Sequence, residues 1–139
     1  KRLQRLLSNK RFFLTYGDGV SNVNIKKLLS FHKKGKKIAT LTYVRPPARF
    51  GAIKVSNNHV TYFKEKSRLD EGWINGGFFI FEPSIFKYIK NDKTFLEKEP
   101  IQKISKNKQL LGFKHNGFWQ CMDTKRDKEI LEKSYNKFK

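Results

Sequence analysis

Apolar and polar positions follow two different periods along this chain, and the changes between them mark the expected elements. Runs rich in β-branched and aromatic residues alternate with stretches in which apolar residues recur every three or four positions. The first pattern predicts strands and the second predicts helices. We expect strands over 12–16, 38–44, 52–55, 60–64, 73–81 and 110–115, and helices over 22–34, 83–89, 99–106 and 124–138. Residues 1–11 form a basic amphipathic segment, and residues 118–122 form an apolar, aromatic run.

The first strand, the helix after it and the next strand indicate an α/β fold. The helix has Asn22 or Asn24 as its cap, and Gly35 is expected to end it. A strand, a helix and a second strand in this order form a βαβ unit. We therefore expect parallel pairing between the strands over 12–16 and 38–44.

The middle of the chain predicts a hairpin and an interrupted strand. Two short alternating runs are joined by Ser56-Asn57-Asn58, a pattern typical of a hairpin. The strand over 73–81 contains Asn75-Gly76-Gly77, although its other residues are apolar and aromatic. Glycines inside a strand indicate a bulge or a ligand that packs against the backbone.

Composition points to one folded domain, which we assign to residues 1–139. The chain is 37% hydrophobic and has thirteen Phe, enough for a core and too many for a disordered chain. A single cysteine, Cys121, excludes an internal disulfide and fits a reducing compartment. No apolar run approaches the ~18 residues of a membrane span, so we expect no membrane association and a cytoplasmic location. The first residue is not Met, and we expect the chain to be a piece of a longer protein.

The formal net charge of +19 raises the possibility of a polyanionic partner such as nucleic acid. The 31 basic residues are mostly Lys, however, whereas Arg is the preferred reader of bases and phosphates. They are also scattered, and the densest cluster, over 33–37, lies where a helix is expected to end and cations suit its dipole. We treat nucleic acid as an unlikely partner and keep a basic nucleic-acid-binding module as the alternative function.

Two aspartates, each between an apolar run and a helix, are the leading candidates for chemistry. Asp18 stands in Tyr16-Gly17-Asp18-Gly19, directly after the strand over 12–16. Asp123 follows the apolar run over 118–122 and precedes the last helix. Carboxylates at strand tips are good ligands for Mg²⁺, which favours one or two carboxylates together with substrate phosphates. The alternatives are a simple turn for Asp18 and a helix cap for Asp123.

Polar residues around the hairpin and the interrupted strand are further candidates. Glu65 could accept hydrogen bonds from sugar hydroxyls and Lys66 could neutralise a phosphate, although an exposed ion pair is the alternative. Asn75 and Gly76 offer a polar, open backbone to a ligand, as does the loop that ends at Gly51. The three histidines have no metal-ligand spacing with the cysteine, which excludes a zinc site of the usual kind.

Several of these segments together resemble the sugar-nucleotide pyrophosphorylases, and most closely the glucose-1-phosphate cytidylyltransferases among them. The resemblance covers almost the whole chain in order. The two runs that separate the cytidylyltransferases from their thymidylyl and uridylyl relatives are Trp-Ile-Asn-Gly-Gly-Phe-Phe and Phe-Trp-Gln-x-Met-Asp-Thr. The matching segments are 14–20, 31–33, 46–52, 63–66, 72–79 and 117–124.

The resemblance implies a three-layer α/β fold around a mixed, mostly parallel sheet. It implies a transfer of the cytidylyl group of CTP to α-D-glucose 1-phosphate, which gives CDP-glucose and pyrophosphate, and a homo-oligomeric complete protein. By motif position, Mg²⁺ would be held by Asp18 and Asp123, and the two aspartates and Lys66 would be catalytic. The substrate-binding residues would be Thr15 and Gly17 near the nucleotide, and Gly51, Glu65, Lys66, Asn75 and Gly76 around the sugar phosphate.

One part of the family's pattern is missing. The family begins with a glycine-rich loop that carries Gly-Thr-Arg and a downstream Pro-Lys, and this loop wraps the nucleotide. Neither signature occurs in this sequence. We therefore expect the chain to correspond to the carboxyl-terminal portion of the fold, without its amino-terminal nucleotide-binding part, and to have no useful turnover alone.

Overall fold

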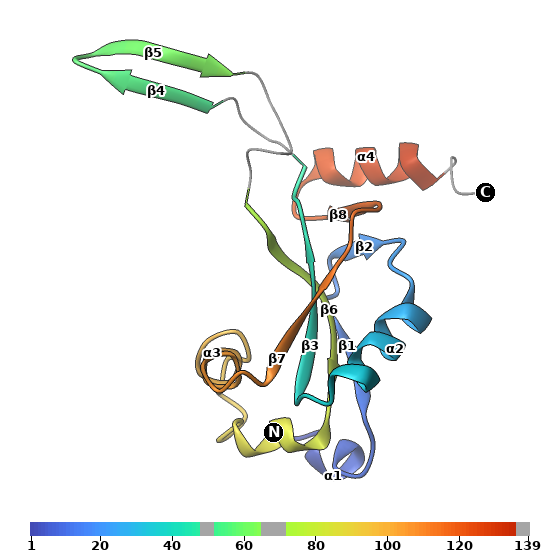
Figure 1. The fold of residues 1–139 in the computed structure, drawn as a ribbon. Helices are drawn as coiled ribbons and strands as arrows, with labels where there is room; N and C mark the ends of the chain where they lie inside the picture. Colours follow the sequence, from blue (N-terminus) through green and yellow to red (C-terminus); the bar gives the residue numbers. More distant parts are fainter. Residues whose placement is uncertain (48–51, 65–71, 136–139) are drawn as a thin grey trace.

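The computed structural model describes residues 1–47, 52–64 and 72–135 (Figure 1). Most of the expected strands and helices are present within a few residues of the bounds that the sequence predicts. The helical elements are α1 (Gln4–Leu7), α2 (Ile25–Gly35), the 3₁₀ helix η1 (Pro83–Lys87), α3 (Glu99–Lys106) and α4 (Lys125–Tyr135). The strands are β1 (Phe12–Thr15), β2 (Gly19–Ser21), β3 (Ala39–Val44), β4 (Ala52–Ser56), β5 (His59–Lys64), β6 (Ile74–Phe81), β7 (Leu110–Lys114) and β8 (Trp119–Cys121).

The largest sheet has the strand order β1-β6-β3-β7. Strands β1, β3 and β7 run in one direction and β6 runs in the other, so the sheet is mixed, as expected, and only the β3–β7 pairing within it is parallel. The expected direct pairing of β1 with β3 is wrong, because β6 lies between them and pairs antiparallel with both. The reason is burial: β6 is apolar on both faces from Phe78 to Phe81, and such a strand is most stable in the middle of a sheet.

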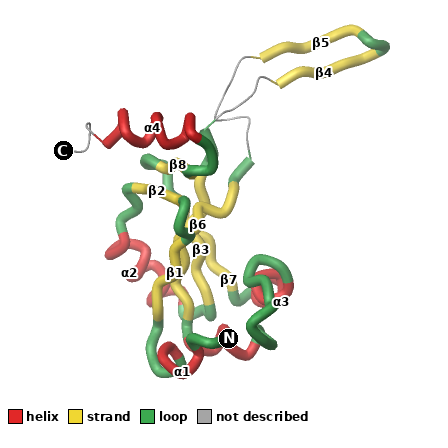
Figure 2. The backbone as a smooth tube through the Cα atoms, turned by 180° about the vertical axis from the view of Figure 1, so that it is seen from behind, coloured by secondary structure: helices red, strands yellow, loops and turns green. Residues whose placement is uncertain are grey.

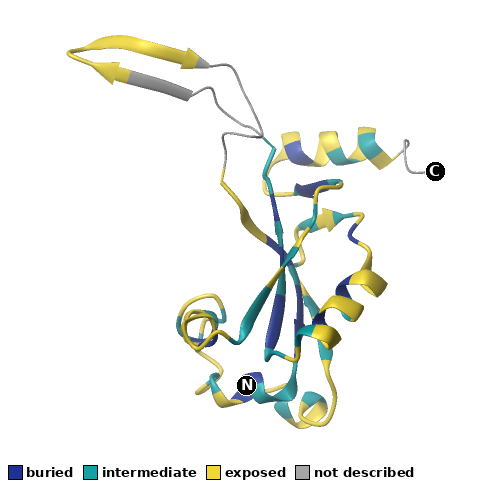
Figure 3. Ribbon diagram, viewed as in Figure 1, coloured by how far each residue is buried: buried dark blue, intermediate teal, exposed yellow. Residues whose placement is uncertain are grey.

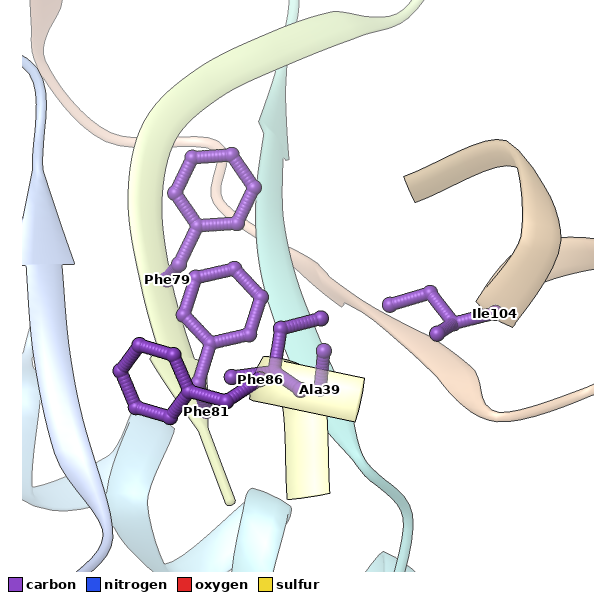
Figure 4. Close-up of a cluster of buried hydrophobic side chains, with 6 residues drawn as sticks. Ala39, Phe79, Phe81, Phe86 and Ile104 are labelled. Atoms are coloured by element: carbon purple, nitrogen blue, oxygen red, sulfur yellow. The ribbon is translucent and has the colours of Figure 1, made fainter. Parts of the chain in front are cut away.

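One face of this sheet carries the main hydrophobic core (Figure 4). Phe79 and Phe81 of β6 stack with ring centroids 5.4 Å apart, and Ala39 of β3 lies in the same cluster. Phe86 of η1 and Ile104 of α3 cover them. Alternate residues of the strands therefore anchor η1 and α3 to this face.

Helix α2 packs on the opposite face, which gives three layers (Figures 1 and 2). Its N-cap is Asn24, whose side chain accepts a hydrogen bond from the backbone N–H of Lys27 at 2.8 Å, as the sequence predicts. Gly35 is still helical, and the left-handed residue that ends the helix is Lys36, with φ of 49°. Glycine at position 35 instead permits close packing, because a Cβ there would lie 2.1 Å from Leu111 Cδ1 of β7.

The hairpin of β4 and β5 confirms the expected turn. Asn57 and Asn58 both have positive φ, 47° and 62°, as a two-residue hairpin turn requires. The hairpin stands apart from the large sheet in both views, and its described side chains are exposed (Figures 2 and 3).

The amphipathic segment over 1–11 is helical only across α1. Leu7 packs against the core, but Leu3 and Leu6 are exposed, so only part of the expected apolar face is buried. Among the described residues, no helix combines the length and the apolar character needed to cross a bilayer.

Candidate functional site

Strands β2 and β8 bring the two candidate aspartates to one place. The strands pair antiparallel with Gly19 opposite Cys121, and the backbone N–H of Met122 donates to the carbonyl oxygen of Asp18 at 2.8 Å. Asp123 is the next residue, and both aspartates are exposed. The β2–β8 ladder was not predicted, because the sequence around 19–21 reads as the turn after β1. This ladder brings the backbone of Asp18 next to that of Met122, the residue before Asp123.

The glycines of β6 let the β2–β8 ladder approach the large sheet. The indole N–H of Trp119 donates to the carbonyl oxygen of Gly76 at 2.8 Å, in a buried contact. A Cβ on Gly76 would lie 3.0 Å from Val44 Cγ1, and a Cβ on Gly19 would lie 3.7 Å from the same Gly76 oxygen. The pairing of β6 with β3 shifts at this point, which confirms the bulge expected from Asn75-Gly76-Gly77.

Asn75 is held by a short chain of hydrogen bonds. Its Nδ2 donates to the Tyr16 hydroxyl at 3.0 Å, and its Oδ1 accepts from the Gly77 backbone N–H at 2.9 Å. The Tyr16 hydroxyl donates in turn to Glu97 Oε1 at 2.7 Å. Burial raises the pKa of Tyr16 above its ordinary value, and the hydrogen bond and negative charge of Glu97 raise it further. Tyr16 therefore stays a neutral donor that fixes the orientation of the Asn75 amide.

Sequence reasoning missed Tyr16 and Glu97 as parts of the site. Tyr16 stands inside the segment that drew attention to Asp18, but nothing local in the sequence connects it to Glu97. Their contact follows from packing of the segment before α3 against the end of β1. We assign both residues a positioning role for Asn75.

The remaining expected site residues fall into two groups. Thr15 ends β1, is exposed, and donates its hydroxyl to the carbonyl oxygen of Tyr16 at 3.0 Å. Gly17 is exposed, with no atom within 4 Å of the position a Cβ would take, so a ligand could approach the backbone there. These two residues adjoin Asp18 in the turn between β1 and β2. The other group, Gly51, Glu65 and Lys66, lies outside the described residues.

Asp127, at the start of α4, organises the backbone around Asp123. Its buried carboxylate accepts hydrogen bonds from the backbone N–H of Asp123 and Thr124, from the Thr124 hydroxyl and from Gln120 Nε2. Thr124 Oγ1 accepts from the Asp127 N–H, so the expected cap at Thr124 is confirmed and forms a capping box. Thr124, and not Asp123, is therefore the N-cap residue of α4. The structure does not support the alternative in which Asp123 caps this helix.

Cys121, Asp123 and Asp127 have potential ligand atoms that lie within 4.8 Å of one another. Only one of these three suits a hard cation. A thiol is a soft ligand, and the Asp127 carboxylate is buried and already accepts four hydrogen bonds. Asp123 is an exposed oxygen donor, and it directly follows Met122, whose backbone N–H donates to the Asp18 carbonyl oxygen.

Comparison with known proteins places these features in a family. The family model described as Nucleotidyl transferase matches residues 3–132. The chain is 46% identical over 131 residues to the glucose-1-phosphate cytidylyltransferases of Salmonella typhi and Salmonella typhimurium, which covers 94% of this chain and 51% of each relative.

Solved structures agree on the fold. HddC from Yersinia pseudotuberculosis superposes with a TM-score of 0.65 at 18% identity, over 99% of this chain and 60% of that one. The chain spans about half the length of the curated relatives it matches. Because the family model matches most of its residues, this chain belongs to the nucleotidyl transferase family.

Proposed function

We propose that this chain forms part of an enzyme that transfers the cytidylyl group of CTP to α-D-glucose 1-phosphate. The products are CDP-glucose and pyrophosphate. One observation carries the proposal: the backbone hydrogen bond from Met122 to Asp18, which joins the ends of β2 and β8 within one residue of Asp123. The 46% identity to glucose-1-phosphate cytidylyltransferases supports the choice of nucleotide and sugar. As the resemblance implies, the complete protein is proposed to be a homo-oligomer.

Mg²⁺ fits the donors that this site offers. Asp18 and Asp123 supply exposed carboxylate oxygens, the ligand type that Mg²⁺ prefers alongside phosphate oxygens and water. When bound, Mg²⁺ would neutralise negative charge on the α-phosphate of the nucleotide and on the leaving pyrophosphate. Asp127 accepts a hydrogen bond from the Asp123 backbone N–H, which holds the backbone of one proposed ligand in place.

The protein residues act mainly by positioning. A phosphate oxygen of glucose 1-phosphate attacks the α-phosphorus of CTP, the bond to the β-phosphate breaks, and pyrophosphate leaves with the electron pair. No covalent intermediate on the chain is needed, because two anions have only to be aligned and their charge offset. Asn75 and the Gly76 backbone would bind sugar hydroxyls together with Gly51 and Glu65. Lys66 would pair with the sugar phosphate.

The cation site can be tested on the chain as it is. Mn²⁺, a paramagnetic substitute for Mg²⁺, should selectively broaden the amide NMR signals of 17–19 and 122–124. Asp18→Asn or Asp123→Asn should remove this broadening. Glu129→Gln, which removes an exposed carboxylate from α4, should leave it unchanged. Broadening that spreads over many acidic residues, or that survives both aspartate substitutions, would refute the site.

A second assay addresses the whole reaction. Incubated with CTP, glucose 1-phosphate and Mg²⁺, this chain alone should form no detectable CDP-glucose, since the nucleotide-wrapping loop is not in the sequence. Glucose 1-phosphate should still shift the amide signals around Asn75. Rapid formation of CDP-glucose would contradict the proposal that nucleotide binding needs a further segment.

A further inference from the structure

The turns that lead from α2 into β3 and from α3 into β7 lie side by side. Strands β3 and β7 are parallel neighbours, and the backbone N–H of Ala39 in β3 donates to the carbonyl oxygen of Gln109, just before β7, at 3.1 Å. Lysines that are scattered along the sequence thereby meet at the end of the sheet opposite β8 and α4 (Figure 1). We name them the lysine cluster, which consists of Lys36, Lys37, Lys106 and Lys108.

No acidic residue balances the charge of the lysine cluster. The sequence has no Asp or Glu over 19–64 or over 100–122, and these ranges include both turns. Glu82 lies at this end of the sheet, because its backbone N–H donates to the Ile38 carbonyl oxygen at 2.8 Å, but its carboxylate contacts Arg11 and His32. Within the described part of the chain, no side chain of the cluster has a hydrogen bond or an ion pair.

The four ammonium groups therefore repel one another. Neighbouring strands lie about 4.8 Å apart, so the two turns are well within the Debye length of about 10 Å at 0.1 M salt. Lys37 is half-buried, and the other three lysines are exposed. A bound polyanion would remove this repulsion, and the exposure of the cluster leaves it open to a large partner.

Two of the lysines have a backbone conformation that lysine rarely adopts. Lys36 and Lys108 are left-handed, with φ of 49° and 55°. Glycine or asparagine is usual in this conformation at a helix end, and here they stand one position earlier, as Gly35 and Asn107. The strain of a left-handed residue with a side chain exceeds what one exposed cation gains at the negative end of a helix. Helix capping alone therefore does not account for lysine at both positions, whereas an anionic partner would.

The side chains of the two turns favour the phosphate backbone of a duplex as this partner. Lysine contacts phosphates as a mobile point charge and does not read bases as arginine does. Residues 36–37 and 106–108 include no apolar or aromatic side chain. Stable binding to a bilayer takes an apolar signal besides the charge, and binding of single strands usually takes aromatic rings on which bases stack. A duplex needs neither, since its phosphates line the outside at high density.

We propose that the lysine cluster is a sequence-independent binding surface for the phosphate backbone of double-stranded nucleic acid, either DNA or RNA. Each lysine would neutralise one phosphate and release a condensed counterion, so affinity should fall steeply as salt rises. The cluster lies at the opposite end of the sheet from β8, where the cation site is proposed. It therefore does not rest on the proposed function.

The test measures fluorescence anisotropy of a labelled DNA duplex of mixed sequence, in EDTA and over a range of salt concentrations. The cluster variant changes all four lysines of the cluster to Gln. It should bind at least about tenfold more weakly at about 0.1 M salt, and its slope of log affinity against log salt should be smaller by about 3–4. The control variant changes four exposed lysines away from both turns: Lys26→Gln, Lys27→Gln, Lys93→Gln and Lys133→Gln. It has the same net charge and should bind within about threefold of the unmodified chain, with a slope change of less than about 1.

A second variant separates binding from folding. Lys36→Gly/Lys108→Gly should unfold at a temperature no lower than that of the unmodified chain, because glycine adopts the left-handed conformation without strain. It should nevertheless bind the duplex more weakly, with a salt slope smaller by about 2. Unchanged affinity in this stable variant would overturn the proposal.

The other outcomes also decide the matter. Equal weakening in the cluster and control variants would show that the duplex responds only to overall charge and would overturn the site. Binding to phosphatidylserine vesicles that is lost in the cluster variant, without binding to a duplex, would replace nucleic acid with a membrane surface. An RNA duplex of the same sequence shows which nucleic acid binds more tightly. Loss of the cluster would leave the Mn²⁺ result at Asp18 and Asp123 unaffected.

Discussion

Asp127→Asn should destabilise the protein strongly for a single isosteric change. The native carboxylate uses both oxygens: Oδ1 accepts from Gln120 Nε2 at 3.0 Å, and Oδ2 accepts from the Thr124 hydroxyl at 2.8 Å, its backbone N–H at 3.1 Å and the Asp123 N–H at 3.3 Å. An asparagine has only one acceptor oxygen, and its NH₂ group must then face a donor. The side chain is buried, so water cannot readily replace the lost partner.

The magnitude follows from the better of the two amide orientations. With the amide oxygen in place of Oδ2, three bonds survive without their charge, and the new NH₂ meets the Gln120 NH₂. A flip of the Gln120 amide does not relieve this contact without cost, because Gln120 Nε2 also donates to the Cys121 carbonyl at 3.0 Å. A buried hydrogen bond to a charged group contributes about 1.5–3 kcal/mol. We expect a loss of about 2 kcal/mol and a fall in Tm of roughly 5–10 °C.

Thermal and urea unfolding, followed by circular dichroism, measure this loss. Glu129→Gln is the matched control, because it removes the same charge from an exposed position of α4 and should change stability by less than about 0.5 kcal/mol. Asp127→Asn should also reduce the Mn²⁺ broadening around Asp123, since the backbone N–H of that residue then bonds a neutral amide oxygen in place of a charged carboxylate. If the Asp127→Asn chain has the same Tm and free energy of unfolding as the unmodified chain, this account of how Asp123 is held is refuted.

Two further predictions concern the fold around the site. Gly77→Ala should lower the free energy of unfolding in urea by about 2–4 kcal/mol, because φ is +77° and the new Cβ would lie 2.8 Å from Tyr16 Cδ2. Gly72→Ala is the control: its Cβ would meet no atom within 4 Å, so the free energy of unfolding should hardly change. Burial, acting against the hydrogen bond to Glu82, lowers the pKa of His32, so below its ordinary value of 6.5 the unfolded chain binds more protons. The free energy of unfolding should therefore fall as pH decreases from about 7 through that value. A His32→Gln chain should lose this part of the slope, and an unchanged slope would exclude His32 as its source.

Local sequence patterns predicted most elements because their causes are local. Helix α3 spans the residues expected from its apolar spacing and early Pro100, and the hairpin turn follows from two asparagines that tolerate positive φ. The position of β6 between β1 and β3 was not predictable in this way. It depends on which strand buries both faces, and this is decided only when the whole sheet assembles. The helix does end at Gly35, but its left-handed cap is Lys36, and the close contact of Gly35 with Leu111 of a distant strand was not predictable for a related reason.

The candidate site was predictable at its carboxylates and not in its supports. Asp18 and Asp123 stand out as acids at the ends of apolar runs, and the structure brings their backbones together. Asp127 did carry a sequence signal, because a Thr with an acidic residue three positions later is a capping pattern. The pairing of Tyr16 with Glu97 carried none, since it arises from packing between segments far apart in the chain.

The same few contacts that close the fold also set the geometry of the proposed cation site. Asp18 stays beside Asp123 only while β2 pairs with β8, and that ladder reaches the large sheet through the bond from Trp119 to the Gly76 carbonyl. A Cβ on Gly76 would lie 3.0 Å from Val44 Cγ1 and 3.2 Å from the Thr42 carbonyl oxygen of β3, so a side chain there should displace β6 together with the carbonyl oxygen that Trp119 binds. A change at Gly76 should therefore weaken cation binding without touching either carboxylate. The glycines that first suggested a ligand against the backbone thus have a second role, which is to bring the two acidic strand tips together.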